Sequence, residues 1–138
     1  MKDNSCIFCL LAGGDIPTAK VYEDEDLTVI LDAGPATKGH ALILPKDHYK
    51  DITEVPQELL GKMMTVAAKV GNAQKKALGA TGFNTLANTG ESAGQTVFHC
   101  HIHVIPRYDG EDVICGWTPK EADSEENAAI AKELSEAF

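Results

Sequence analysis

The chain has 138 residues, a mass of 14.8 kDa, a formal net charge of −9 at pH 7 and a pI near 4.9. This length suits one domain with one hydrophobic core, so we expect a single domain over residues 1–138. The negative charge disfavours long nucleic acid and anionic membranes as partners, whereas local backbone donors and histidines can still hold a small phosphorylated ligand.

The N-terminal segment combines a short helix around Cys6–Ala12 with a CxxC pair, Cys6 and Cys9. This segment is too short and mixed for a signal peptide, and no run approaches the ~18 apolar residues of a membrane span, so we expect a cytoplasmic protein. In that reducing compartment CxxC favours metal binding over a disulfide, with two buried thiols as the alternative. A thioredoxin-like redox pair would need a preceding strand, for which there is no room.

The next segment predicts a β-hairpin. The acidic cluster Glu23–Asp26 is typical of a solvated turn. Two apolar runs follow, Leu27–Leu31 and Ala41–Leu44, separated by a Gly- and Pro-containing turn region from Gly34 to Gly39. We therefore expect two consecutive antiparallel strands.

Apolar residues then recur at helical spacing from Pro56, which suits a first helical position, to about Leu78. Strand character returns at Phe83–Ala87 and Phe98–Ile105. The last segment, about 120–138, predicts a helical extension in which Asp123 and Glu126 resemble a capping box. Helices segregated from a mainly antiparallel sheet make the fold class α+β.

Three of the five histidines lie in one run, His99-Cys100-His101-Ile102-His103. Side chains alternate faces along a strand, so the three imidazoles are expected on one side, with neighbours about 6.5–7 Å apart. Neutral imidazoles bind transition metals, and an imidazole nitrogen in the right tautomer is also a nucleophile toward phosphorus. The run therefore predicts either a metal site or a catalytic site.

The segment just before this run favours an anion. Gly90 and Gly94 permit close backbone approach, and Asn88, Gln95 and Thr96 carry groups that can donate hydrogen bonds to phosphate oxygens. An ordinary hairpin turn is the alternative for this segment alone, but its position next to the histidines favours phosphate binding.

With these residues the chain resembles the histidine-triad (HIT) superfamily, and within it the bacterial Hit branch, close to the purine nucleoside phosphoramidases. The signature of three histidines alternating with hydrophobic residues corresponds here to His99 through Ile105, with Cys100 as a mild departure. The similarity covers most of the chain, in the following segments: Cys6–Cys9, Ile16-Pro17, Val21–Asp24, Leu31-Asp32, Lys38–His40, Leu44–Lys46 and Ala93–Val97. It implies a HIT-like fold with a five-stranded sheet, one long helix, and short N- and C-terminal helices.

The resemblance also implies residue roles. His101 matches the family nucleophile, His103 the contact near the leaving group, His99 the histidine whose carbonyl fixes the nucleophile's tautomer, and His40 the fourth histidine. It places the ribose on Asp32 and the phosphate on the loop. It places the purine in an apolar cleft, for which we expect Phe8, Ile16 and Leu31. The implied nucleotide-binding set is Asp32, Asn88, Gly94, Gln95, Thr96, Phe8, Ile16 and Leu31.

The resemblance further implies a structural zinc on Cys6, Cys9, His48 and His99, and a homodimer formed through the long helix and the strand after Gly82. In relatives the C-terminal segment, here with Trp117, reaches the partner's active site. We assign Cys100 and Cys115 to packing, and a role for Mg²⁺ with the substrate stays open.

The implied activity is hydrolysis of a purine nucleotide at its α-phosphorus through a nucleotidyl-histidine, on a phosphoramidate or a dinucleoside polyphosphate. A nucleotidyltransferase is a weaker alternative, because that branch carries proline and glutamine where this chain has Ile102 and His103. A non-enzymatic zinc- or nucleotide-binding protein is the other alternative.

Overall fold

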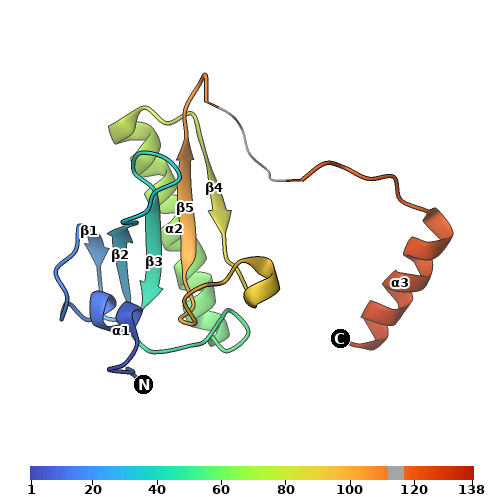
Figure 1. Cartoon of the computed structure of the whole chain (residues 1–138), viewed down its shortest axis with the longest axis horizontal. Helices are drawn as coiled ribbons and strands as arrows, with labels where there is room; N and C mark the ends of the chain where they lie inside the picture. Colours follow the sequence, from blue (N-terminus) through green and yellow to red (C-terminus); the bar gives the residue numbers. More distant parts are fainter. Residues whose placement is uncertain (112–116) are drawn as a thin grey trace.

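The computed structural model describes residues 1–111 and 117–138, and it forms one antiparallel sheet with a helix on each face (Figure 1). Along the chain run α1 (Ile7–Ala12), β1 (Lys20–Glu23), β2 (Leu27–Leu31), β3 (Ala41–Pro45), α2 (Gln57–Leu78), β4 (Gly82–Leu86), the 3₁₀ turn η1 (Glu91–Ala93), β5 (Ile102–Arg107) and α3 (Ser124–Glu136). The sheet has the order β1-β2-β3-β5-β4, and every neighbouring pair is antiparallel. This confirms the expected α+β class and the five-stranded sheet.

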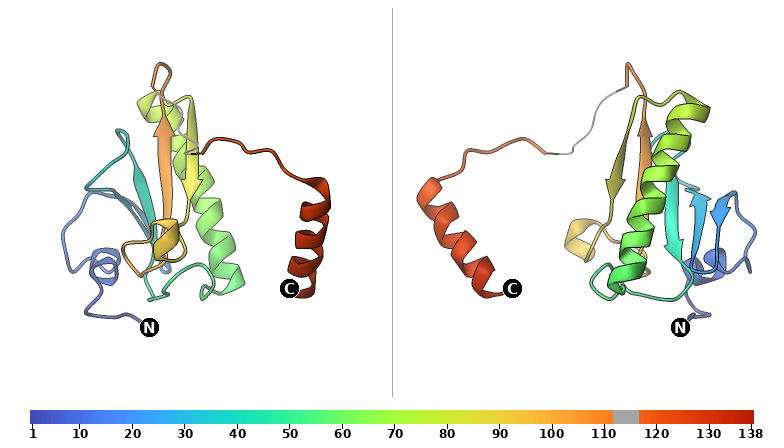
Figure 2. Two further views of the ribbon diagram at one scale, coloured as in Figure 1. Left: turned by 45° about the vertical axis from the view of Figure 1, so that its right-hand side comes forward. Right: turned by 180° about the vertical axis from the view of Figure 1, so that it is seen from behind.

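The two faces of the sheet bury different side chains because residues alternate along each strand. One face packs on α2 and contains Leu27, Val29 and Ile43, and the other packs on α1 and contains Ile30 and Leu42. Figure 2 shows α2 covering one face over much of its height. The α1 face is the one on which the histidines lie.

The predicted hairpin of β2 and β3 is confirmed, with Val29 opposite Ile43. The prediction for α2 is correct to within one residue, except that Pro56 has an extended ψ of 144° and caps the helix instead of forming its first turn. The helix ends at Gly79, whose φ of 74° is a left-handed conformation that glycine adopts readily. Strand β1 was not predicted, since its four residues are all exposed and show no alternation.

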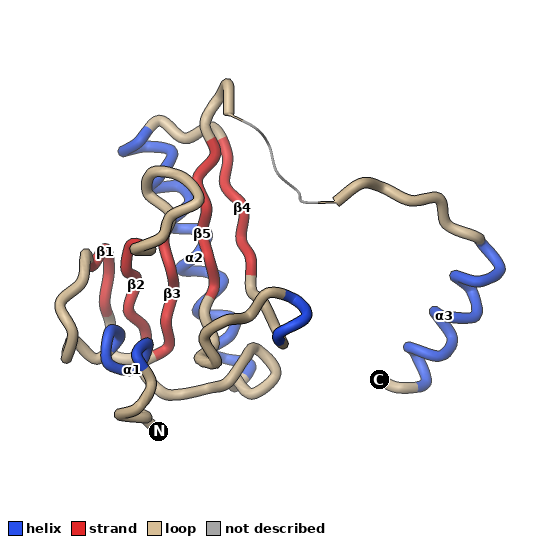
Figure 3. The backbone as a smooth tube through the Cα atoms, viewed as in Figure 1, coloured by secondary structure: helices blue, strands red, loops and turns tan. Residues whose placement is uncertain are grey.

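The predicted strand Phe98–Ile105 is wrong at its start, because β5 begins at Ile102 (Figure 3). The backbone before it bonds to loops instead of a neighbouring strand, and the Cys100 N–H donates to the Tyr49 carbonyl at 2.6 Å. The alternation still holds through this irregular stretch. Cys100 and Ile102 face the α2 core, where Cys100 packs as expected.

The C-terminal helix α3 is present as predicted, and the Asp123 side chain caps it by accepting the N–H groups of Glu125 and Glu126. Every residue from 117 to 138 is exposed. Cys115 lies outside the described residues. Within the described part of the chain, no helix is long and apolar enough to cross a membrane.

Candidate functional site

The pocket that contains the histidines has a volume of about 540 Å³ and lies on the α1 face of the sheet. His101 and His103 line it together with Asp32 from the end of β2. The loop before the histidines contributes Asn88, Gly94 and Thr96 to its lining. The structure therefore brings the histidine run, the loop before it and the end of β2 to one cavity.

Hydrogen bonds determine which nitrogen of each imidazole carries the proton. The Nδ1 atom of His101 lies 2.7 Å from the His99 carbonyl oxygen, which can only accept, so Nδ1 holds the proton. The Nε2 atom of a neutral His101 therefore keeps its lone pair. Burial lowers the pKa of His101, which favours this neutral form.

His103 is held in the opposite tautomer through His40. The Ala36 N–H donates to His40 Nδ1 at 2.9 Å, so the proton of a neutral His40 is on Nε2. That Nε2 lies 2.9 Å from His103 Nδ1, which must then accept, and the proton of His103 is on its own Nε2. Burial lowers the pKa of His40, and burial followed by the neighbouring histidines lowers the pKa of His103 to about 4. Two adjacent rings therefore offer a lone pair and an N–H.

Asp32, His40 and His103 lie close enough together to suggest a metal site. The hydrogen bond from Ala36 argues against it, because a metal on His40 Nε2 would require a proton on Nδ1, where the Ala36 N–H already points. The Asp32 carboxylate lies 3.5 Å from His40 Nε2 and supports the proton there. We therefore interpret this cluster as a hydrogen-bond network.

The apolar wall of the pocket differs in part from the prediction. Phe8 lines it, and its ring lies 4.9 Å from the His101 ring in an edge-on arrangement. Leu31 lies outside it, because it points to the α2 face of the sheet, whereas Ile30 points to the α1 face and into the pocket. Ile16 is likewise replaced in the lining by its neighbour Pro17.

Gln95 is the other correction. Gln95 is only 3% exposed, and both its amide oxygen and its amide nitrogen form hydrogen bonds within the protein. Its Oε1 accepts the Gly90 N–H at 2.9 Å, and its Nε2 donates to the carbonyls of Lys50 and Val97. The side chain therefore shapes the loop and has no free donor for a phosphate.

Several residues of the apolar wall were missed from the sequence. Ile30 and Leu42 lie on β2 and β3 and face the pocket together. The period-two alternation of the two predicted strands could have identified them once the histidine-bearing face was known.

A second cluster lies directly behind the histidine run, and it contains the four predicted zinc ligands. The ligand atoms of Cys6, Cys9, His48 and His99 all lie within 4.8 Å of one another. Both cysteine sulfurs are 3.4 Å from His99 Nδ1, and the Cys9 sulfur is 3.5 Å from His48 Nδ1. In a tetrahedral zinc site sulfur and nitrogen ligands are about 3.5 Å apart, so this donor set fits zinc.

The orientation of His99 also fits a metal ligand. Its Nε2 lies 2.9 Å from the Pro45 carbonyl oxygen and therefore carries the proton, which leaves the Nδ1 lone pair toward the cysteines. A backbone carbonyl in this position is a common partner of metal-bound histidines. His99 is fully buried, and burial lowers its pKa to about 4, so its ring is neutral.

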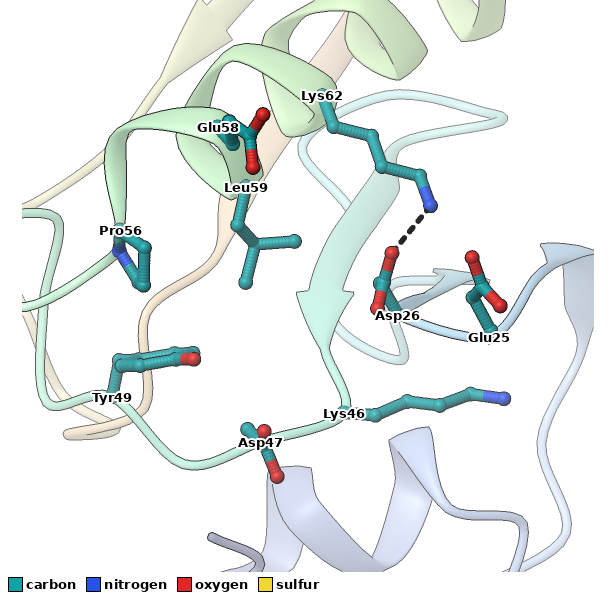
Figure 4. Close-up of a pocket in the computed structure, with 9 residues that line it drawn as sticks. All are labelled: Glu25, Asp26, Lys46, Asp47, Tyr49, Pro56, Glu58, Leu59 and Lys62. Atoms are coloured by element: carbon teal, nitrogen blue, oxygen red, sulfur yellow. Dashed lines mark hydrogen bonds and ion pairs between the residues drawn. The ribbon is translucent and has the colours of Figure 1, made fainter.

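Another pocket, shown in Figure 4, lies away from the histidines between the start of α2 and the turn before β2. Its lysines are already paired. Lys62 contacts Asp26 at 2.7 Å and Asp24 at 3.1 Å, and Lys46 contacts Glu23 at 2.9 Å. Since its cations are neutralised and no histidine lines it, we do not consider it a candidate active site.

Residues 13–110 match the HIT domain family model. Among curated proteins, the chain is 46% identical over 108 residues to Protein hit of Bacillus subtilis, covering 78% of this chain and 74% of that protein. It is 36% identical over 133 residues to the adenosine 5'-monophosphoramidase of Saccharomyces cerevisiae, covering 96% and 82%.

Solved structures give the same result. A HIT family protein from Bacillus anthracis superposes with a TM-score of 0.86 at 41% identity, covering 100% of this chain and 99% of that one. A zinc-bound histidine triad family protein from Mycobacterium smegmatis gives a TM-score of 0.77 at 38% identity, covering 97% and 98%.

Proposed function

Because the chain belongs to the HIT family, we propose that it is a hydrolase that cleaves a phosphoramidate or phosphoanhydride bond at the α-phosphorus of a purine nucleotide. The observation that carries this proposal is the bond from His101 Nδ1 to the His99 carbonyl, which leaves the Nε2 lone pair of a pocket histidine available. The similarity to a named adenosine 5'-monophosphoramidase supports the substrate class.

In the proposed reaction His101 Nε2 attacks the α-phosphorus in line, and the bond from phosphorus to the leaving group breaks as the phosphorus–nitrogen bond forms. The proton on Nδ1 stays in place, where the His99 carbonyl stabilises the positive charge that develops on the ring. The Nε2–H of His103 donates to the leaving group. Water then attacks the same phosphorus and returns a proton to His103 Nε2. The bond from phosphorus to His101 breaks with its electron pair going back to Nε2, and the nucleoside monophosphate is released.

The pocket supplies contacts for the rest of the nucleotide. Asn88, Gly94 and Thr96 surround the place proposed for the phosphate, and Asp32 is placed to accept hydrogen bonds from ribose hydroxyls. The purine would lie against Phe8 and the apolar side chains of the adjacent strands, Ile30 among them. A net charge of −9 makes these local contacts necessary, since the overall field repels the phosphate.

We also propose that Cys6, Cys9, His48 and His99 hold one structural zinc. The donor set, the fit of its distances and the zinc-bound relative support this assignment. Bound there, the ion would supply four-coordinate cross-linking of three chain segments with no open position for a substrate. The catalytic proton transfers are assigned to histidines outside the cluster.

For the assembly, we propose one HIT domain over residues 1–138, with about 120–138 as an extension, and a homodimer through α2 and β4. β4 is an edge strand of the sheet and so leaves backbone groups free for pairing with a second copy. Sedimentation that shows only monomer at micromolar concentration would contradict the dimer.

The experiment that tests the reaction compares adenosine phosphoramidate with diadenosine polyphosphates as substrates and traps the intermediate for mass spectrometry. We expect added nucleotidyl mass on the peptide that contains His101, and loss of turnover in His101→Ala. A His101→Ala variant that hydrolyses at the full rate would instead favour a protein that binds nucleotide without this chemistry.

A further inference from the structure

An apolar groove runs along the face of the sheet opposite the histidines, between α2 and the outer strands β1 and β2. Helix α2 packs mainly against β3, β5 and β4 and covers β2 at Leu27 and Val29, so on this side it leaves β1 and the Leu31 end of β2 without a covering helix. Val21, Leu31 and Leu78 in the groove are 50%, 39% and 40% exposed. Exposed apolar surface of this kind, gathered in one concave site, marks an interaction surface.

A buried polar side chain lies at the floor of the groove. Gln74 lines it and is 5% exposed, and its Nε2 donates to the carbonyls of Gly39 and Val104. Its Oε1 is buried without a hydrogen-bond partner. Such a group carries a free-energy cost, but because the atom lies beneath the surface a docked segment gains no contact with it.

Helix α3 is the matching unpartnered element of the same chain. Ile130, Leu134 and Phe138 follow one another at helical spacing and are all exposed, at 43%, 63% and 112%. An isolated helix of 13 residues is only marginally stable in water, so α3 needs a surface for its apolar side. The groove follows α2 from Val66 to Leu78, and at 1.5 Å per residue that stretch and α3 are both about 20 Å long.

The charges of the two surfaces are complementary. Within a strongly acidic chain, the groove is lined by two lysines, Lys38 and Lys69, and no carboxylate is among the described residues that line it. Helix α3 carries four glutamates and one lysine. Opposite charges at the rim favour docking of α3 in this groove over docking of α3 on the acidic surface elsewhere on the molecule.

The position of α3 indicates that it docks in the groove of a second copy and not in the groove of its own chain. Figures 1 and 2 show α3 beyond the β4 edge, on the side away from β1 and β2. This is where a second copy would lie if the sheet pairs across β4. We propose that α3 of each copy docks in the groove between α2 and β1–β2 of a second copy. A two-fold pair exchanges both helices and is closed.

This inference rests on the proposed dimer and not on the proposed reaction, so hydrolysis assays do not decide it. The test places a photo-cross-linking benzoylphenylalanine at Leu134 of the full chain. Unlabelled and nitrogen-15-labelled copies are then refolded together, and cross-linked peptides are identified by mass spectrometry. We expect adducts that join α3 of one isotopic form to residues 66–78 of the other. The same probe at Lys132, on the polar side of α3, should give at least tenfold fewer.

A groove variant provides the second measurement. Ala73 is an exposed residue of α2 that lines the groove, so Ala73→Glu places a carboxylate there without disturbing the core. We expect it to reduce the mixed-isotope adduct at least tenfold, whereas Asn72→Glu, one residue away and outside the lining, should not. Adducts within one isotopic form only, adducts on another surface, or equal effects of the two variants would each overturn the proposal.

Discussion

Replacement of His40 tests how the site assigns its protons. Leucine at this position removes the N–H that His103 Nδ1 accepts at 2.9 Å, and it leaves the Ala36 N–H without its acceptor. His103 can then carry its proton on Nδ1 and present a lone pair to the leaving group. Loss of one donor aimed at developing charge lowers kcat about 10²–10³-fold. We expect this for His40→Leu, with a much smaller change in KM.

His40→Gln is the matched control, because an amide oxygen can accept from Ala36 while its NH₂ donates to His103. We expect it to keep kcat within about tenfold of the original protein, the span of 1.4 kcal/mol. The kinetics of both variants are measured on adenosine phosphoramidate after circular dichroism has shown that they are folded. If the leucine and glutamine variants lose the same activity, or if the loss lies in KM, the tautomer argument is wrong.

Three further predictions concern the metal, the packing and the pH dependence. Metal analysis of the purified protein should give one zinc per chain, lost in Cys9→Ala and kept in Cys100→Ala, whose thiol lies in the core. A Cβ at Gly71 would lie 2.3–2.5 Å from ring atoms of Phe83, whereas one at Gly61 would meet nothing within 4 Å. Overpacking costs about 1–3 kcal/mol and the better helix former returns about 1 kcal/mol, so Gly71→Ala should lower the free energy of unfolding in urea by about 1 kcal/mol. Gly61→Ala should raise it by up to about 1 kcal/mol. Changes of the same sign in the two variants would contradict the packing. Because burial lowers the pKa of His103 to about 4 from 6.5, the unfolded chain takes up its proton first, so the free energy of unfolding should fall as the pH drops from about 6.5 to 4. His103→Gln should make this dependence shallower without abolishing it, because burial also lowers the pKa of His99 to about 4. Unfolding curves measured across that range check this, and an unchanged slope would count against the assignment.

Patterns that repeat over several residues were sufficient to predict much of the fold. The apolar recurrence of α2, the paired runs of β2 and β3 and the cap at Asp123 each depend on local chemistry, and each is present in the structure. β1 was missed because an edge strand of four exposed residues gains its order from its neighbour and not from its own pattern.

For the site, the sequence indicated which residue types could act there better than it indicated where each side chain would point. The CxxC pair and His48 come together with His99 as the resemblance implied. Leu31 and Gln95 show the limit. Leu31 differs from Ile30 only in which face of the sheet it takes, and the Gln95 amide is used by Gly90, Lys50 and Val97, whose proximity depends on the tertiary fold.

The contacts of His99 link the two ends of the site. Its ring donates to the Pro45 carbonyl and turns Nδ1 toward Cys6 and Cys9, while its own carbonyl accepts the proton of His101 Nδ1. A shift of this residue would therefore alter both the sulfur–nitrogen cluster and the direction of the His101 lone pair. Since His99 and His101 precede β5 and have no strand partner, the cluster helps to hold the backbone at that point, together with the bond from the Cys100 N–H to the Tyr49 carbonyl. In the reaction that we propose, the N-terminal cysteines would thus act through the position of one carbonyl oxygen, and not through contact with the substrate.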